Sequence, residues 1–210
     1  MLLKKEIQKL LSIGKFFNTG ISPSRSKKFY VVLGAIVLSC LLIYYFVGQY
    51  LEANNSVSSA KTKLLEAYRE IGSAGGDAYI FAKYYVKGSY PVEFDAAWQE
   101  LIRQYQKLSF DSIWKEEDVL AMDKSAENYM KIIDQIIEKL NVHAFVVGEE
   151  EFIAFKYNYQ GAQAKLYAVI DKYNEIADEV NLKLSIFPYS AFSFLSGSKK
   201  SALVPVNILY

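Results

Sequence analysis

The chain has 210 residues, of which 22% are charged, and its formal net charge at pH 7 is only +1. That length suits one folded domain with a short anchor, and the near-neutral balance excludes the strongly basic footprint of a nucleic-acid-binding protein. Threonine is scarce and there are only four prolines, which favours long uninterrupted helices over a strand-rich fold, so we predict an all-α protein.

Residues 1–28 form a basic segment, with seven Lys or Arg residues against the single acid Glu6. Within it, residues 2–17 place apolar and lysine-rich faces at helical spacing, the pattern of an amphipathic helix that lies on anionic lipid. The alternative is that these lysines only set the membrane topology and that the segment is loosely ordered. Residues 19–26, with Gly20, Pro23 and three serines, are predicted to be a linker.

Residues 29–51 contain no charged side chain, and 23 helical residues cover about 35 Å, more than the roughly 30 Å hydrocarbon core of a bilayer. We therefore predict a single transmembrane helix. Lys and Arg gather before this run, whereas the charges that follow it are balanced. The positive-inside rule then predicts an inner-membrane protein with a cytoplasmic N-terminus and an extracytoplasmic remainder.

Two other interpretations of this run are open. A cleaved signal peptide would have a shorter apolar core that ends in small residues. Cys40, the only cysteine, follows Val37-Leu38-Ser39 as in a lipoprotein processing site, but residues 41–47 are apolar where a lipidated chain normally turns polar. Because no cysteine follows Cys40, no disulfide is predicted in the rest of the chain.

Residues 52–187 carry apolar side chains at alternating spacings of three and four, the repeat of amphipathic helices that pack against one another. The stripes run over residues 57–85, 94–108, 119–140 and 152–187, and the last of them ends at Phe187. Three long helices and a shorter one favour an elongated antiparallel bundle, with a parallel coiled-coil oligomer as the alternative. Gly72, Gly75 and Gly76 within the first stripe predict a kink or a close helix crossing.

The tail, residues 188–210, is apolar but shows no helical period and is broken by Ser, Gly and Pro. Its cluster of Phe192, Phe194 and Leu195, together with Phe187, is too apolar to stay in water. Either these side chains pack on the bundle, or they contact the membrane or a protein partner. They are our candidate site.

Side chains suited to catalysis or metal binding do not cluster in the sequence. His143 is the single histidine and has no second ligand near it, so we predict no metal site. The acidic runs Glu116-Glu117-Asp118 and Glu149-Glu150-Glu151 lie where helices are expected to begin, and the helix dipole accounts for negative charge there. We therefore predict no enzyme activity and no cofactor.

The end of the last predicted helix carries a recognisable pattern of residues. The pattern consists of Tyr173-Asn174, Val180-Asn181, Leu184, Phe187-Pro188, Ala191, Phe192 and Phe194. It resembles the LemA family of bacterial membrane-anchored helical proteins, and the resemblance is strongest over residues 150–195. In the first helix the family's usual basic cluster is missing and the glycine-rich stretch stands instead, so the chain would be a divergent member. The resemblance implies an N-terminal transmembrane helix, no established enzymatic activity and a role in membrane organisation.

The anchor, the helical stripes and this resemblance lead to one expectation about function. We expect a non-enzymatic, single-pass membrane-anchored scaffold or interaction protein of the bacterial envelope. Its expected partners are the lipid bilayer, other membrane or envelope proteins and a second copy of itself, with no role for nucleic acid. The alternative is a ligand-sensing or adaptor ectodomain that acts through a membrane partner.

Overall fold

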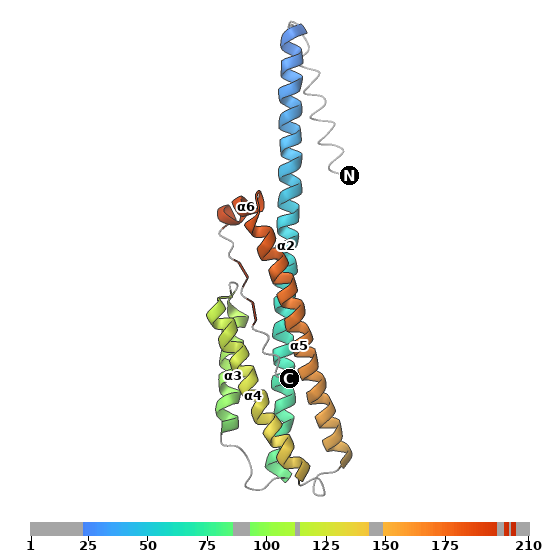
Figure 1. The fold of residues 1–210 in the computed structure, drawn as a ribbon, viewed down its shortest axis with the longest axis vertical. Coiled ribbons are helices and arrows are strands. Elements are labelled where there is room, and N and C mark those ends of the chain that lie inside the picture. Colours follow the sequence, from blue (N-terminus) through green and yellow to red (C-terminus); the bar gives the residue numbers. More distant parts are fainter. Residues whose placement is uncertain are drawn as a thin grey trace. The chain divides into compact units, whose positions relative to one another are not determined.

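The computed structural model describes residues 23–85, 93–111, 114–142, 149–196, 200–201 and 203–204. These residues form five helices and no strand (Figure 1). The helices are α2 (Pro23–Tyr85), α3 (Glu93–Phe110), α4 (Glu116–Val142), α5 (Glu149–Ser185) and α6 (Tyr189–Ser196). The predicted all-α class is confirmed, whereas the basic segment at residues 2–17 and His143 lie outside the described residues.

The chain divides into two compact units, Met1–Gly48 and Gln49–Tyr210. In the first unit the described residues belong to α2, which begins at Pro23, so part of the predicted linker is helical. Among the described residues, α2 is the one helix long and apolar enough to cross a membrane, and the side chains of its most apolar stretch are not buried within the protein. The predicted membrane span and the first predicted bundle helix therefore belong to a single helix of 63 residues.

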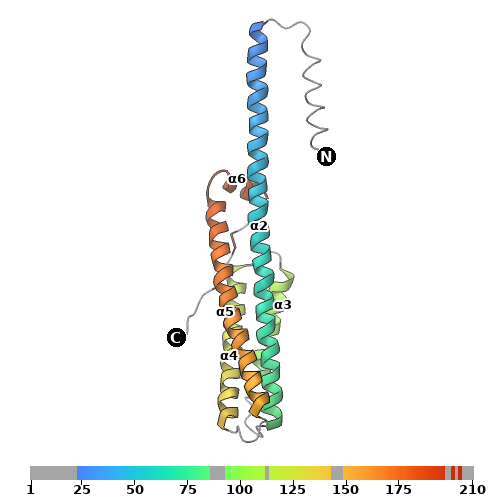
Figure 2. The same cartoon turned by 90° about the vertical axis from the view of Figure 1, so that its right-hand side faces the viewer.

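The second unit is an antiparallel bundle in which the later part of α2 packs with α3, α4 and α5 (Figures 1 and 2). The predicted stripes supply its core, because each helix turns its apolar face inward to leave water. Fully or almost fully buried side chains include Leu64, Ile71, Met122, Ile133, Leu166 and Tyr173.

Two of the three clustered glycines allow side chains of neighbouring helices to approach the backbone of α2. A Cβ atom on Gly72 would lie 3.1 Å from the indole ring of Trp98 on α3, and one on Gly75 would overlap the ring of Tyr129 on α4. The close contacts at these two positions are made by aromatic side chains, so the predicted kink or close helix crossing stays a prediction. Gly76 faces open space.

Trp114 and Asp118 join the start of α4 to the neighbouring helices. The indole Nε1 of Trp114 donates a 2.9 Å hydrogen bond to the carbonyl of Leu108 at the end of α3. Asp118 is buried, and its Oδ1 accepts the Lys107 ammonium at 2.5 Å. Both acidic runs lie at helix N-termini, as predicted. Asp118 in addition forms an ion pair with Lys107, which the helix dipole alone would not require.

The tail turns back and follows α5 in the opposite direction. Asn174 of α5 donates to the carbonyl of Val204 and accepts from its N–H, at 2.7 and 2.9 Å. Asn181 makes the same pair of bonds with Ser201, at 2.9 and 2.8 Å. Seven helical residues rise about 10.5 Å and three extended residues span about 10 Å, so the two asparagines match the spacing of the two tail residues.

The tail also contains a helix that the sequence did not predict. α5 ends at Ser185, and α6 follows after a short turn that contains Phe187 and Pro188. Phe187 was predicted to be the last member of the buried stripe, and that prediction is wrong. Because it lies in the turn, it no longer follows the helical period and its side chain is exposed.

Candidate functional site

The four candidate side chains around α6 separate into two groups. Phe187, Phe194 and Leu195 are 81%, 84% and 79% exposed, which is unusual for side chains of this size. Phe192 instead packs on Tyr50 of α2, with 6.5 Å between the ring centroids. Packing on the bundle, one of the two alternatives predicted for the tail, therefore occurs at Phe192, whereas contact with the membrane or a partner stays a prediction for the three exposed side chains.

Two further exposed apolar residues are close to this group in the sequence. Leu182, in the last turn of α5, and Ile186, which directly follows the last residue of that helix, are both exposed. With Phe187, Phe194 and Leu195 they make up what we call the apolar edge. Both fall outside the three-four stripe of buried residues, and this position in the sequence is the feature that could have predicted their exposure.

Phe192 places α6 against the beginning of the second unit. A small apolar cluster there contains Tyr50, Ala53 and Val57 of α2 together with Val180 and Leu184 of α5. Phe192 and Tyr189 pack against this cluster. Tyr50 is the last residue but one of the uncharged run 29–51, so α6 packs on α2 where that run ends.

A buried polar pair, Asp123 and Tyr68, lies inside the bundle. Asp123 of α4 is only 5% exposed, and its Oδ2 atom and the hydroxyl of Tyr68 on α2 have no hydrogen-bond partner among the described residues. Burial raises the pKa of Asp123 to about 6, and the nearby carboxylate of Glu127 adds to the rise. The nearby hydroxyl of Tyr68 lowers the pKa of Asp123 and so partly offsets this rise, although the two side chains do not meet the geometry of a hydrogen bond.

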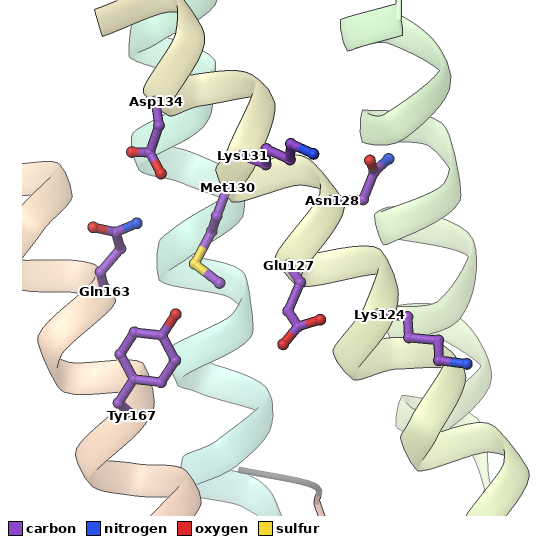
Figure 3. Close-up of a pocket in the computed structure, with 8 residues that line it drawn as sticks. All are labelled: Lys124, Glu127, Asn128, Met130, Lys131, Asp134, Gln163 and Tyr167. Carbon is purple, nitrogen blue, oxygen red and sulfur yellow. The ribbon is translucent and has the colours of Figure 1, made fainter. Parts of the chain in front are cut away.

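A groove of about 520 Å³ lies beside Glu127 on α4 (Figure 3). Met130, Asp134, Gln163 and Tyr167 face its centre, whereas the side chains of Lys124, Asn128 and Lys131 point to the other side of α4. Burial raises the pKa of Tyr167, and the carboxylates of Glu127, Asp123 and Asp134 raise it further. The groove has room for a small molecule; the acids Glu127 and Asp134 line it, whereas the two lysines among its lining residues direct their side chains away from its centre.

No group of three or more His, Cys, Asp or Glu side chains that could hold a metal ion occurs in the described part of the chain. Cys40 is exposed on α2 within the uncharged run.

Comparison with family models, curated proteins and solved structures gave no match for this chain. The resemblance to the LemA family is therefore not supported by these comparisons and stays a hypothesis based on residues 173–194. The structure does give two residues of that pattern a role, because Asn174 and Asn181 hold the tail.

Proposed function

We propose that this chain is a non-enzymatic, single-pass membrane protein whose helical bundle acts as a scaffold that organises or remodels a bacterial envelope membrane. One observation carries the proposal. α2 continues without a break from the uncharged run 29–51 into the residues that form the core of the bundle, beginning at Tyr50 and Ala53. A bundle built directly on a membrane span, with no linker between them, suits a protein that acts at the membrane surface.

The distribution of charge supports an orientation for this scaffold. Seven Lys or Arg residues precede Phe29, and by the positive-inside rule this excess favours a cytoplasmic N-terminus with the bundle on the other side of the membrane. The LemA-like residues around 173–194 agree with a role in envelope organisation.

The anchoring part of the proposal is tested by membrane extraction. The full chain should resist alkaline carbonate, and added protease should cut the bundle only from the extracytoplasmic side. Val37→Arg introduces a charge in the middle of the run at a cost of about 3 kcal/mol for insertion, so a large fraction should become extractable. Ile80→Arg is the matched control, because Ile80 is an equally exposed apolar residue of α2 within the bundle. A wild-type chain that carbonate releases would contradict the proposal.

The scaffold role is tested separately by deletion and rescue. Deletion should change membrane shape or organisation in electron cryotomograms, and the wild-type gene should restore it. Unchanged membranes after deletion would contradict a scaffold role while leaving membrane anchoring intact.

The groove beside Glu127 favours a second candidate function, a ligand-sensing or adaptor ectodomain. Crosslinking in native membranes, followed by mass spectrometry, separates the two functions. Crosslinks only between copies of the chain support the scaffold. A stoichiometric membrane partner supports the adaptor, and loss of that partner in Glu127→Gln but not in the exposed control Glu66→Gln would assign it to the groove.

A further inference from the structure

We infer that the apolar edge inserts into the headgroup region of the bilayer that α2 crosses, so that the bundle contacts the membrane at a second place and the occupant of this edge is lipid. The inference rests on the proposed membrane anchoring. It goes further by assigning an interaction surface, its residues and its partner.

The first step is the exposure of the edge. Leu182, Ile186, Phe187, Phe194 and Leu195 all expose more than half of their side chains, and they fall within 14 residues of sequence. Single exposed apolar residues are common on soluble proteins, but a concentration of this kind marks a surface that is covered in the working state.

The second step is the level of the edge along α2. α6 carries Phe194 and Leu195, and its Phe192 packs on Tyr50, one residue before the uncharged run ends at Leu51. The run spans about 35 Å against a hydrocarbon core of roughly 30 Å, so its last residues stand at the headgroups. α6 is therefore held by its own packing at the level where lipid headgroups meet the hydrocarbon.

The third step is the chemistry of the edge, which suits lipid better than a protein groove. A helix that docks in a groove presents anchors in a regular i, i+3, i+4, i+7 pattern over at least two turns. α6 has eight residues, and Phe192 is already engaged with Tyr50. What it leaves exposed is the adjacent pair Phe194 and Leu195, with no regular stripe, and a fluid lipid surface requires none.

The composition of α6 supports the same partner. The helix contains no charged residue, and its three serines and Tyr189 are interspersed among the apolar side chains. A neutral segment that combines aromatic rings and hydroxyls is suited to the interface between headgroups and acyl chains. Because no charge is involved, we expect zwitterionic lipid to be sufficient.

The experiment uses the full chain in nanodiscs of phosphatidylcholine. Cys40→Ser removes the natural thiol, and Phe194→Cys then carries an environment-sensitive fluorophore. Lipids with a spin label at the headgroup or high on the acyl chain report proximity by quenching. The matched control is Tyr84→Cys, an exposed aromatic position 34 residues, or about 51 Å, along α2 from Tyr50. We expect severalfold stronger quenching at position 194 than at position 84.

The outcomes separate the two proposals. A carbonate-resistant chain with equal quenching at positions 194 and 84 overturns the lipid contact and leaves the anchoring intact. A chain that carbonate extracts overturns the anchoring itself. A third outcome uses the same variant without the fluorophore, so that the thiol at position 194 is free. Efficient disulfide formation between two copies on addition of a mild oxidant, with no lipid quenching in the labelled protein, would assign the edge to a second copy of the chain and also overturn the inference.

Discussion

Tyr129 of α4 fills the space beside Gly75 of α2 where any other residue would place its Cβ atom. Its hydroxyl reaches the carbonyl of Gly72 at 3.4 Å, and its ring packs on Phe94 and Trp98 of α3. Three helices therefore meet around one aromatic side chain, at a point where α2 has no side chain of its own.

Gly75→Ala should destabilise the bundle. The methyl group would overlap a buried ring that other rings hold in place, and overpacking of this kind costs about 1–3 kcal/mol. Gly76→Ala is the control, because its Cβ meets nothing and alanine favours helix by up to about 1 kcal/mol. Urea unfolding of the full chain in detergent, followed by circular dichroism, measures both. Equal stabilities of the two variants would show that the ring can move aside.

Asn174→Ala should release the tail from α5. It removes two hydrogen bonds and leaves the backbone groups of the buried Val204 without these partners, at a cost of about 2 kcal/mol. Hydrogen–deuterium exchange should become faster in the peptide that contains Ser201 and Val204. Asn158→Ala, an exposed asparagine of the same helix, should leave that exchange unchanged. Slow exchange in both variants would mean that packing alone retains the tail.

Asp123 should make stability fall as the pH rises. Its pKa is about 6 in the folded protein against an ordinary value of 3.8, so between these values the folded chain holds a proton that the unfolded chain has released. The stabilisation is fully present below 3.8 and is lost as the pH rises through about 6, with an upper limit of about 3 kcal/mol. The groups that face this carboxyl are Tyr68 of α2, Glu127 of α4 and Tyr167 of α5.

Asp123→Asn tests this pH dependence, because it removes the titrating group and should flatten the profile of unfolding free energy between about pH 4 and about pH 6. Asp178→Asn, at an exposed carboxylate of α5, should leave the slope as in the wild type. Identical slopes for Asp123→Asn and the wild type would assign the pH dependence to other groups.

Lys107→Met should lower the unfolding midpoint because it leaves the carboxylate of Asp118 buried without its cation. Lys115→Met is the control, since Lys115 pairs with Glu117 at 3.7 Å and both side chains are exposed. The same urea titration measures both variants. A midpoint shift that is no larger for Lys107→Met than for Lys115→Met would indicate that water solvates Asp118 adequately.

Local patterns were sufficient for much of the architecture. The charge-free run, the three-four spacing of residues such as Leu64, Met122 and Leu166, and the acidic helix starts all depend on neighbours within a few turns of helix. The prediction failed where the helical period stops, at Phe187, and in the short helix α6, which contains about two turns and has no stripe of its own.

The candidate site was predicted in part. The apolar character of Phe187, Phe194 and Leu195 is visible in the sequence. Their exposure is not, because it depends on which face of the tail packs on the bundle. Phe192 reaches Tyr50, and α6 then turns its remaining apolar residues away from the bundle. The sequence also did not reveal that Asp123 would be buried, because it stands beside Met122 and reads as the polar side of the stripe.

The sequence by itself thus determined the helices, their apolar faces and the segment long enough to cross a membrane, because hydrophobic period and charge act over short distances along the chain. Only the tertiary structure decided the pairs that join distant residues. Tyr129 and Gly72 are 57 residues apart, and Asn174 and Val204 are 30 residues apart. Such contacts depend on how the helices cross. A side chain that could pack against several partners has its partner selected by the close packing of the complete bundle.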